Sequence, residues 1–390
     1  MQFANIIGQN KLINSLIKIV QDQRVSHTQL FFGQFGSGTF ALALAYAQFI
    51  NCTNKQYFPY ASGEELKADS CNTCPSCLKY NTLTHPDLHF CFPNVANEKL
   101  GIKQNPEAYL YLNLFREFVL KNDAYIDLES WYETIDVGNK QGVINVRDVA
   151  RIINNLSLKA FEATFKVTIV WCFDKLHYDA APKLLKILEE PDPNTLFFLI
   201  TDNSDAILPT IISRTQLVKV PSLSTETIIN YLETEKGLSE DVAKQQAIIA
   251  EGSLIKIRNI ANTDNRFEEF IVEWTRNTFS IYKDISPIIN MADEFAAWGR
   301  EQQRLFFTMA INVFRKSMYI NMGINNSNDF FEIKDDKFKT NFPKLINPNV
   351  CEKIYKLIEE ADYHIQRNAN PKILFLDLSI KTGEVISMRK

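Results

Sequence analysis

The stretch GQFGSGTF, residues 33–40, has the glycine spacing of a phosphate-binding loop but lacks the residues that carry out its chemistry. The usual pattern is G-x-x-x-x-G-K-[ST], in which the lysine reaches the β- and γ-phosphates and the hydroxyl holds Mg²⁺. Gly33 and Gly38 fit this pattern, whereas Thr39 stands at the lysine position and Phe40 at the hydroxyl position. The stretch is therefore either a nucleotide site that has lost its function or a plain glycine-rich turn.

The residues on either side of the loop favour a former nucleotide site. The short apolar run 29–32 leads into Gly33, and the alanine- and leucine-rich segment after Gly38 is typical of a helix. A strand, a glycine-rich turn and a helix in this order are the context that a phosphate-binding loop requires. Without the lysine, only backbone amides and the helix dipole would attract an anion, and they would do so weakly.

The pattern downstream of the loop predicts a parallel α/β sheet followed by helices. Apolar, β-branched runs predict buried strands at 166–173, 195–201 and 216–220, and helical patterns lie at 145–158 and 178–190. Strands that alternate with helices form parallel sheets. After residue 221 the pattern is almost entirely helical. We therefore expect an α/β domain at 1–221, a small helical domain at 222–264 and a larger helical domain at 265–390.

A nucleotide-hydrolysing site also needs carboxylates at the end of a neighbouring strand, where they hold Mg²⁺. In the run 166–173, the two expected carboxylate positions are occupied by Trp171 and Cys172. Asp174 follows too late to replace them, and we expect it to cap the next turn. Because both halves of the site have lost their charges, the sequence predicts that this chain does not hydrolyse ATP.

Length and composition set wider limits. The chain has 390 residues, of which 46% are hydrophobic and 23% charged, which is ordinary for two or three folded soluble domains. Its net charge of −4 provides no overall attraction to nucleic acid. The first residues lack the pattern of a signal peptide, and no apolar run is long enough to span a membrane. We therefore expect a protein without a membrane anchor.

The seven cysteines are unevenly spread, and four are bunched at Cys52, Cys71, Cys74 and Cys77. Two consecutive C-x-x-C steps aim three thiolates at one point, and a fourth from the preceding helix completes a tetrahedron. Four thiolates around Zn²⁺ form a closed structural site. The alternatives are an iron–sulfur cluster, a redox pair or free thiols. We expect structural zinc in a reducing compartment, and ordinary thiols at the remaining positions, Cys91, Cys172 and Cys351.

Several motifs, in order, resemble the clamp-loader subunits of bacterial DNA polymerase III, which are AAA+ proteins, and most closely the delta-prime type. The resemblance covers roughly residues 1–220 and is weaker beyond them. The stretch L-L-K-I-L-E-E-P at residues 184–191 is close to the family pattern. In the motif at 209–215, Thr215 stands where cysteine is usual. Besides the loop and the cysteines, the motifs are residues 3–9, 24–27, 85–87, 184–191, 196–203 and 209–215.

The resemblance implies an AAA+ α/β domain that carries an inserted zinc module at about 52–80 and a further insertion at 93–142. It implies that 222–264 is a helical lid and that 265–390 is a helical oligomerisation collar. The lid has Ile255 where active relatives place an arginine, and Lys256 is the nearest cation. The insertion is either a contact surface or a solvated elaboration, and we expect the latter.

The resemblance also implies a function. Arg214 would act in trans as an arginine finger on ATP held by a neighbouring subunit, a role suited to its permanently charged, bidentate guanidinium. The chain would be a non-catalytic cytoplasmic subunit of a hetero-pentamer with gamma/tau-type motor subunits and a delta subunit. This complex would load the sliding clamp on primed DNA during replication.

Two other functions stay open at this point. A gamma/tau-type subunit that hydrolyses ATP would need the cation and the Mg²⁺ ligand that the loop and the strand end lack. A free-standing DNA-binding zinc protein would need a basic surface, which the net negative charge disfavours.

Overall fold

The computed structural model describes residues 1–390 except 59–62, 64, 103–105, 138–139, 158, 190–191, 263–265, 325–334, 368 and 388–390. It consists of two compact units, Met1–Lys256 and Ile257–Lys390, which are described separately below. The expected domain boundaries at residues 221 and 264 stay predictions. Residue 264 lies outside the described residues, as do residues 190 and 191 at the end of the L-L-K-I-L-E-E-P motif.

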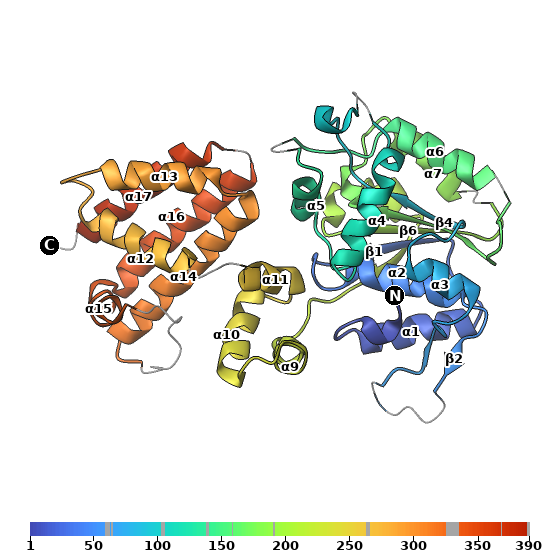
Figure 1. The fold of residues 1–390 in the computed structure, drawn as a ribbon, viewed down its shortest axis with the longest axis horizontal. Coiled ribbons are helices and arrows are strands. Elements are labelled where there is room, and N and C mark those ends of the chain that lie inside the picture. Colours follow the sequence, from blue (N-terminus) through green and yellow to red (C-terminus); the bar gives the residue numbers. More distant parts are fainter. Residues whose placement is uncertain are drawn as a thin grey trace. The chain divides into compact units, whose positions relative to one another are not determined.

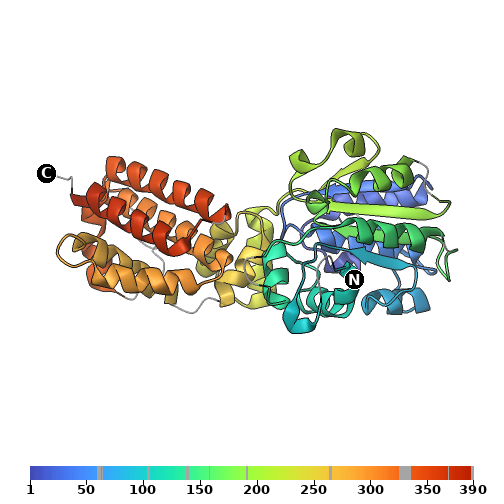
Figure 2. The same ribbon diagram turned by 90° about the horizontal axis from the view of Figure 1, so that it is seen from above.

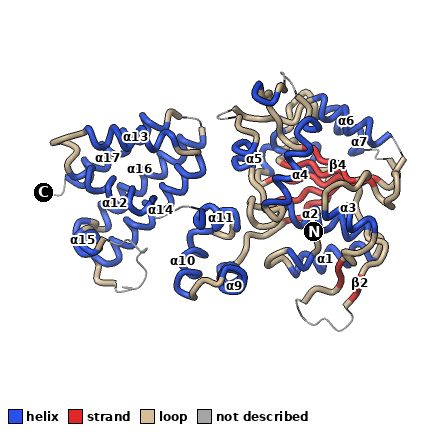
Figure 3. Tube along the Cα trace, in the orientation of Figure 1, coloured by secondary structure: helices blue, strands red, loops and turns tan. Residues whose placement is uncertain are grey.

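The first unit is built around a parallel sheet whose strands run in the order β4-β5-β6-β1-β7 (Figures 1 and 3). All residues of the neighbouring inner strands β5 and β6 are buried, as expected for parallel strands that are covered on both faces. The predicted parallel α/β sheet is confirmed, and β4 is a strand that the sequence pattern did not reveal. The strands are β1 (Thr28–Phe32), β4 (Leu88–Cys91), β5 (Lys166–Trp171), β6 (Thr195–Thr201) and β7 (Gln216–Lys219).

Helices cover both faces of this sheet, because successive side chains of a strand point to opposite sides. On one face, the ring centroids of Phe31 and Phe198 lie 6.4 and 5.4 Å from that of Tyr46, which belongs to α2. Leu30 and Leu199, one residue along from these, belong instead to the core formed with α6 and α7. The helices are α1 (Asn10–Gln21), α2 (Thr39–Asn51), α3 (Pro75–Asn81), α4 (Leu112–Lys121), α5 (Leu128–Thr134), α6 (Val146–Ser157), α7 (Ala181–Glu189) and α8 (Pro209–Ile212).

Short elements complete the unit. A two-stranded antiparallel ribbon, β2 (Gln56–Tyr57) and β3 (Ala68–Asp69), precedes α3. Three further helices follow the sheet, and the first of them begins where the Ser224 side chain accepts a hydrogen bond from Thr227 N at 3.1 Å. They are α9 (Thr225–Lys236), α10 (Glu240–Ala250) and α11 (Leu254–Asn262), and the last of them continues beyond Lys256 into the second unit. The 3₁₀ turns are η1 (Phe3–Asn5), η2 (Glu98–Leu100), η3 (Ala108–Tyr111), η4 (Phe173–Lys175), η5 (Ser204–Ala206) and, in the second unit, η6 (Pro343–Leu345).

The second unit is helical throughout its described residues (Figure 2). Its core is strongly aromatic: Trp274, Phe295, Phe306 and Phe375 are fully buried and their rings contact one another. The last helix approaches α12 closely at Gly383, where a Cβ atom would lie 2.9 Å from a backbone oxygen. The predicted helical character of this region is confirmed. The helices are α12 (Arg266–Phe279), α13 (Ser286–Ala297), α14 (Arg300–Asn321), α15 (Asp336–Asn341), α16 (Pro348–Gln366) and α17 (Pro371–Ser387).

Candidate functional site

The glycine-rich loop lies between β1 and α2, in the strand–turn–helix context that the sequence predicts. Gly36 and Gly38 have φ values of +89° and +95°, a backbone conformation that side chains with a Cβ rarely adopt. A Cβ atom on Gly33 would lie 2.4 Å from the backbone oxygen of Val220, so this position also needs glycine. The glycines of the motif are therefore explained by the shape of the loop, whatever the loop binds.

The two positions that would carry the chemistry of the loop point into the protein. Thr39 is 2% exposed, and its hydroxyl lies 3.1 Å from that of Ser37. Phe40 is 3% exposed, and its ring contacts those of Phe90 and Trp171 at centroid distances of 6.3 and 6.2 Å. A phenyl ring thus lies where the hydroxyl ligand of Mg²⁺ would be in an intact loop.

The end of β5 forms the facing wall and is also apolar. Trp171 and Cys172 occupy the positions where an ATP-hydrolysing site would have carboxylates, and both are buried. Burial raises the pKa of the Cys172 thiol. The Asp174 carboxylate accepts a hydrogen bond from the Thr201 hydroxyl at 3.0 Å and pairs with Lys175 at 3.1 Å. We expected Asp174 to cap the next turn, but its carboxylate instead connects η4 to the end of β6.

Hydrogen bonds from distant parts of the first unit hold the loop. Leu254 N donates to Gly36 O at 3.0 Å, and the Ser253 hydroxyl donates to Phe35 O at 3.0 Å. On the other side, the Gln9 side chain donates to Ser37 O at 3.1 Å. The loop is therefore fixed by its carbonyl groups to the segment that begins α11 and to the start of α1. Lys256, the cation nearest the expected lid arginine, pairs with Glu251 at 2.5 Å.

The insertion at 93–142 contributes two residues to this site that the sequence did not single out. Phe115 of α4 is fully buried, with its ring 6.0 Å from Phe40 and 5.7 Å from Trp171. Tyr125 lies against Gly38, and its hydroxyl accepts a hydrogen bond from Ile7 N at 3.0 Å. The expectation of a solvated elaboration is wrong for these aromatic residues, because they form part of the core beside the loop.

The four bunched cysteines come together. The sulfur atoms of Cys52, Cys71, Cys74 and Cys77 all lie within 4.8 Å of one another, close enough to bind one metal ion. Cys52 ends α2, and Cys74 is the residue before α3, so two helix ends and a turn bring the thiols to one point. Backbone N–H groups of Cys71 and Cys74 donate to neighbouring sulfurs at 3.3 Å, as suits thiolates. The residues therefore fit a single metal ion with four sulfur ligands.

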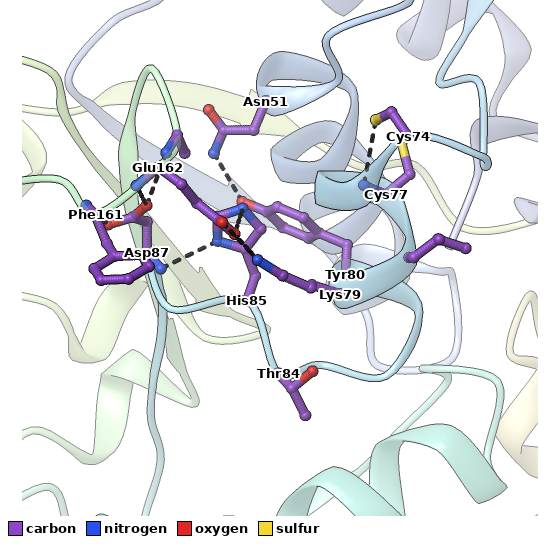
Figure 4. A network of polar contacts seen from close by, with 12 residues as sticks. Asn51, Cys74, Cys77, Lys79, Tyr80, Thr84, His85, Asp87, Phe161 and Glu162 are labelled. Atoms are coloured by element: carbon purple, nitrogen blue, oxygen red, sulfur yellow. Dashed lines mark hydrogen bonds and ion pairs between the residues drawn. The ribbon is translucent and has the colours of Figure 1, made fainter.

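A polar network connects α3, which begins at the cysteine cluster, with the loop that precedes β5 (Figure 4). The Asp87 carboxylate accepts hydrogen bonds from three successive backbone N–H groups, of residues 161, 162 and 163, at 2.6, 2.9 and 2.9 Å. Burial opposes ionisation, but these donors outweigh it and lower the pKa of Asp87. His85 Nδ1 accepts a bond from Asp87 N at 3.1 Å, and its ring lies against Tyr80 of α3. The H-P-D motif is thus a connector between the cysteine cluster and the sheet.

Arg214 follows α8 and is partly exposed. Its guanidinium pairs with Glu189 of α7 at 2.6 Å and donates to Thr210 O at 2.7 Å. Its side chain is 37% exposed, so a second subunit can approach it. Thr215, where the family has cysteine, donates through its hydroxyl to Ile212 O at 2.9 Å and keeps the turn closed. The role of Arg214 in trans stays a prediction.

Comparison with known proteins assigns the family. The model of the family described as "DNA polymerase III, delta subunit" matches residues 8–224, more than half of the chain. The chain belongs to this DNA polymerase III subunit family. The matched region contains the loop, the cysteine cluster and Arg214. Among the described residues, no helix is long and apolar enough to cross a membrane.

The curated relatives of this chain include proteins named as delta' subunits and proteins named as tau or gamma/tau subunits. "DNA polymerase III subunit delta'" of Bacillus subtilis is 26% identical over 69% of this chain and 60% of its own length. "DNA polymerase III subunit tau" of the same organism is 20% identical over 96% of this chain and 60% of its own length. The chain thus spans 60% of the length of each. Among solved structures, a gamma subunit-related protein of Thermotoga maritima is 14% identical with a TM-score of 0.33, covering 79% of this chain and 98% of that one.

Proposed function

We propose that this chain is a non-catalytic clamp-loader subunit of the delta-prime kind. It would work in a hetero-pentamer with gamma/tau-type motor subunits and a delta subunit, and help to place a sliding clamp on primed DNA. The observation that carries the proposal is the contrast between two sites in one unit. Aromatic side chains fill the space between the loop and the end of β5, whereas Arg214 of the Ser-Arg motif stays accessible. The chain would therefore act on ATP that a neighbour binds.

In that assembly Arg214 would exchange its carboxylate partner for phosphate oxygens. The pair with Glu189 is partly exposed on both sides, at 37% and 47%. Partly exposed ion pairs contribute about 0–1 kcal/mol, so leaving Glu189 costs little. The guanidinium presents a planar fork that binds two phosphate oxygens at once and keeps its charge at any relevant pH. Bound to a γ-phosphate, it would stabilise the charge that develops in the transition state.

The cysteine cluster would hold structural Zn²⁺. Zinc–sulfur bonds of about 2.3 Å in a tetrahedron place the sulfurs about 3.8 Å apart, and Cys52 and Cys71 sulfurs lie 3.6 Å apart. An iron–sulfur cluster places several metal atoms between its thiolates and needs wider spacing. Four protein sulfurs would leave no position open for a water ligand, so the metal would stabilise the fold and would not catalyse a reaction.

The second candidate is an ATP-hydrolysing motor subunit, because relatives named gamma/tau also match this chain, at 20–23% identity. Such an enzyme needs a cation at the loop and a carboxylate at the strand end. The corresponding residues here are Thr39 and Trp171, both buried and neither charged. These uncharged residues support the proposal of the delta-prime kind over a motor subunit.

The deciding experiment is the ATPase activity of a clamp loader reconstituted with this chain, measured with clamp and primed DNA. We expect Arg214→Ala to leave assembly intact and to reduce hydrolysis at the adjoining site by a factor on the order of 10³ or more. Arg214→Lys should restore little, because an ammonium group cannot bind two oxygens in a plane. Lys219→Ala, which removes an exposed cation from nearby β7, is the matched control. Full activity of the complex that contains Arg214→Ala would refute the proposal.

A further inference from the structure

The insertion next to the glycine-rich loop carries a further inference, which rests on the proposal that this loop is a former nucleotide site. We infer that the inserted segment 108–137 occupies the nucleotide site from within. In this view, the segment has replaced nucleotide as the partner that keeps the loop ordered. The loss of ATP chemistry would then be more than a loss of charges, because no space for the phosphates and metal ion would be left.

The first support is steric. Three rings contact one another: Phe115 of the insertion, Phe40 of α2 and Trp171 of β5. The Phe40 centroid lies 6.0 Å from that of Phe115 and 6.2 Å from that of Trp171, and the centroids of Phe115 and Trp171 are 5.7 Å apart. Aromatic pairs in contact have their centroids 4.5–7 Å apart, so the space between loop and strand end is filled. All three side chains are at most 3% exposed. A hydrated Mg²⁺ ion or a charged phosphate placed among these rings would lose its water without gaining a charged partner.

The second support is a direct connection between the insertion and both segments beside the loop. The Tyr125 ring lies against Gly38, where a Cβ atom would be 3.3 Å from the ring. Its hydroxyl accepts the hydrogen bond of Ile7 N at 3.0 Å, close after η1 at the start of the chain. One side chain of the insertion thus contacts the start of α2 and the backbone near η1 together, as a bound ligand would.

The third support is that the insertion is anchored firmly. The buried Asp148 carboxylate of α6 accepts hydrogen bonds from Ala108 N at 2.7 Å and from the Asn94 side chain at 3.0 Å. Trp131 is fully buried, donates to Pro93 O at 3.1 Å and packs edge-on against Phe115 at 5.4 Å. Opening the site would break these contacts and expose several large rings. The segment is therefore a fixed part of the fold and differs from a lid that opens.

Nucleotide binding tests the steric part. The full chain is titrated with Mg-ATP and with Mg-ADP by calorimetry, and we expect no binding. The variant Thr39→Lys/Phe40→Thr, which restores the loop residues, should also fail to bind, because Phe115 and Tyr125 still fill the site. Binding by either protein would overturn the inference. Binding without hydrolysis would leave the proposed role of Arg214 standing, since the ATPase of the reconstituted complex decides that role separately.

Hydrogen exchange tests the ordering part with two matched variants. Tyr125→Phe removes the hydroxyl that accepts from Ile7 N, whereas Tyr132→Phe removes a hydroxyl that accepts from Gly142 N at 2.8 Å, within the same insertion. We expect amide exchange at Ile7 to become several-fold faster in Tyr125→Phe and to stay unchanged in Tyr132→Phe. Exchange in β5 and β6 reports whether each variant is folded. Unchanged exchange at Ile7 in folded Tyr125→Phe, or an equal rise in both variants, would overturn the inference.

Discussion

Phe40 and Trp171 show at the scale of single residues how the two walls of the proposed former nucleotide site depend on each other. Their rings are in contact and both are almost fully buried. A carboxylate at position 171 alone would be a buried charge without a partner, and a hydroxyl at position 40 alone would be a buried polar group among rings; both are costly. Each aromatic residue therefore makes the other one favourable, and we expect that a single substitution at either position would not create an ATP site.

Asp87 provides a prediction about pH. Its carboxylate is held ionised by three backbone N–H groups, which lower its pKa below the ordinary value of 3.8. A carboxyl group whose pKa is lowered on folding adds stability above its unfolded pKa, and this stability is lost as the pH falls through the folded pKa. Asp87→Asn should therefore destabilise the chain by roughly 1–3 kcal/mol at pH 7, and this difference should shrink below about pH 4.

Urea unfolding of wild type and Asp87→Asn at pH 7 and at pH 3 measures this effect. Asp136→Asn is the control, because the Asp136 side chain is 70% exposed and pairs with Lys99, which is equally exposed to solvent. The control should change stability little at either pH. A loss for Asp87→Asn that is equally large at both pH values would show that the charge of Asp87 is not what stabilises the loop.

Residue-level prediction from sequence succeeded where a motif fixes a position and failed where none does. The glycine spacing and the four cysteines are local patterns, so the sequence alone is enough to name Phe40 and the four cysteines that the fold brings together. Phe115 and Tyr125 lie in an insertion without a motif, and only the fold brings them to the loop. Their burial could have been suspected only from the high aromatic content of the insertion.

The cysteine module gives a prediction at the scale of elements. Cys77→Ser should lower the zinc content of protein purified under reducing conditions, because a serine hydroxyl is a poor replacement for a thiolate ligand. Since α3 and the end of α2 meet at these sulfurs, we also expect faster hydrogen exchange in α3. Cys351→Ser is the matched control, because Cys351 is also buried but lies in α16 of the second unit. Zinc retained at the wild-type level in Cys77→Ser would contradict the assignment.

The contact between the loop and the start of α11 gives a second prediction at this scale. A Cβ atom on Gly36 would meet the Ser253 hydroxyl at 2.0 Å, in addition to the strain of φ +89°. Gly237→Ala is the matched control, because Gly237 has φ +65° but nothing within 4 Å of its Cβ position. The control should lose about 1–2 kcal/mol from backbone strain alone, and Gly36→Ala should lose clearly more. Equal losses on urea unfolding would show that the contact with Ser253 is unimportant.

Among the elements, long and strongly patterned ones were predictable from sequence, and short ones were not. The inner strands β5 and β6 are rich in β-branched and other apolar residues, and their predicted positions are confirmed. β4 (Leu88–Cys91) was missed because it has only four residues and includes a histidine. Its place at the edge of the sheet depends on pairing with β5, a contact between residues far apart in the chain.

At the scale of the whole molecule, the two units have separate cores. The first contains the loop, the cysteine cluster and Arg214, and the second has an aromatic core built around Trp274 and Phe306. A unit with its own core can fold alone. The proposed function assigns the chemistry to the first unit and assembly to the second, so cutting the chain should separate these two properties.

A truncated chain of residues 1–262, which keeps α11 whole, tests this separation. We expect it to unfold cooperatively, to bind zinc as the full chain does and to fail to co-purify with gamma/tau-type and delta subunits. Full-length Arg214→Ala should behave in the opposite way, entering the complex while lowering its ATPase activity, so the two variants together distinguish assembly from catalysis. Circular dichroism, metal analysis and co-purification measure the three properties. A truncated chain that assembles normally would refute the collar role of 265–390, and one that does not fold would show that the first unit depends on the second.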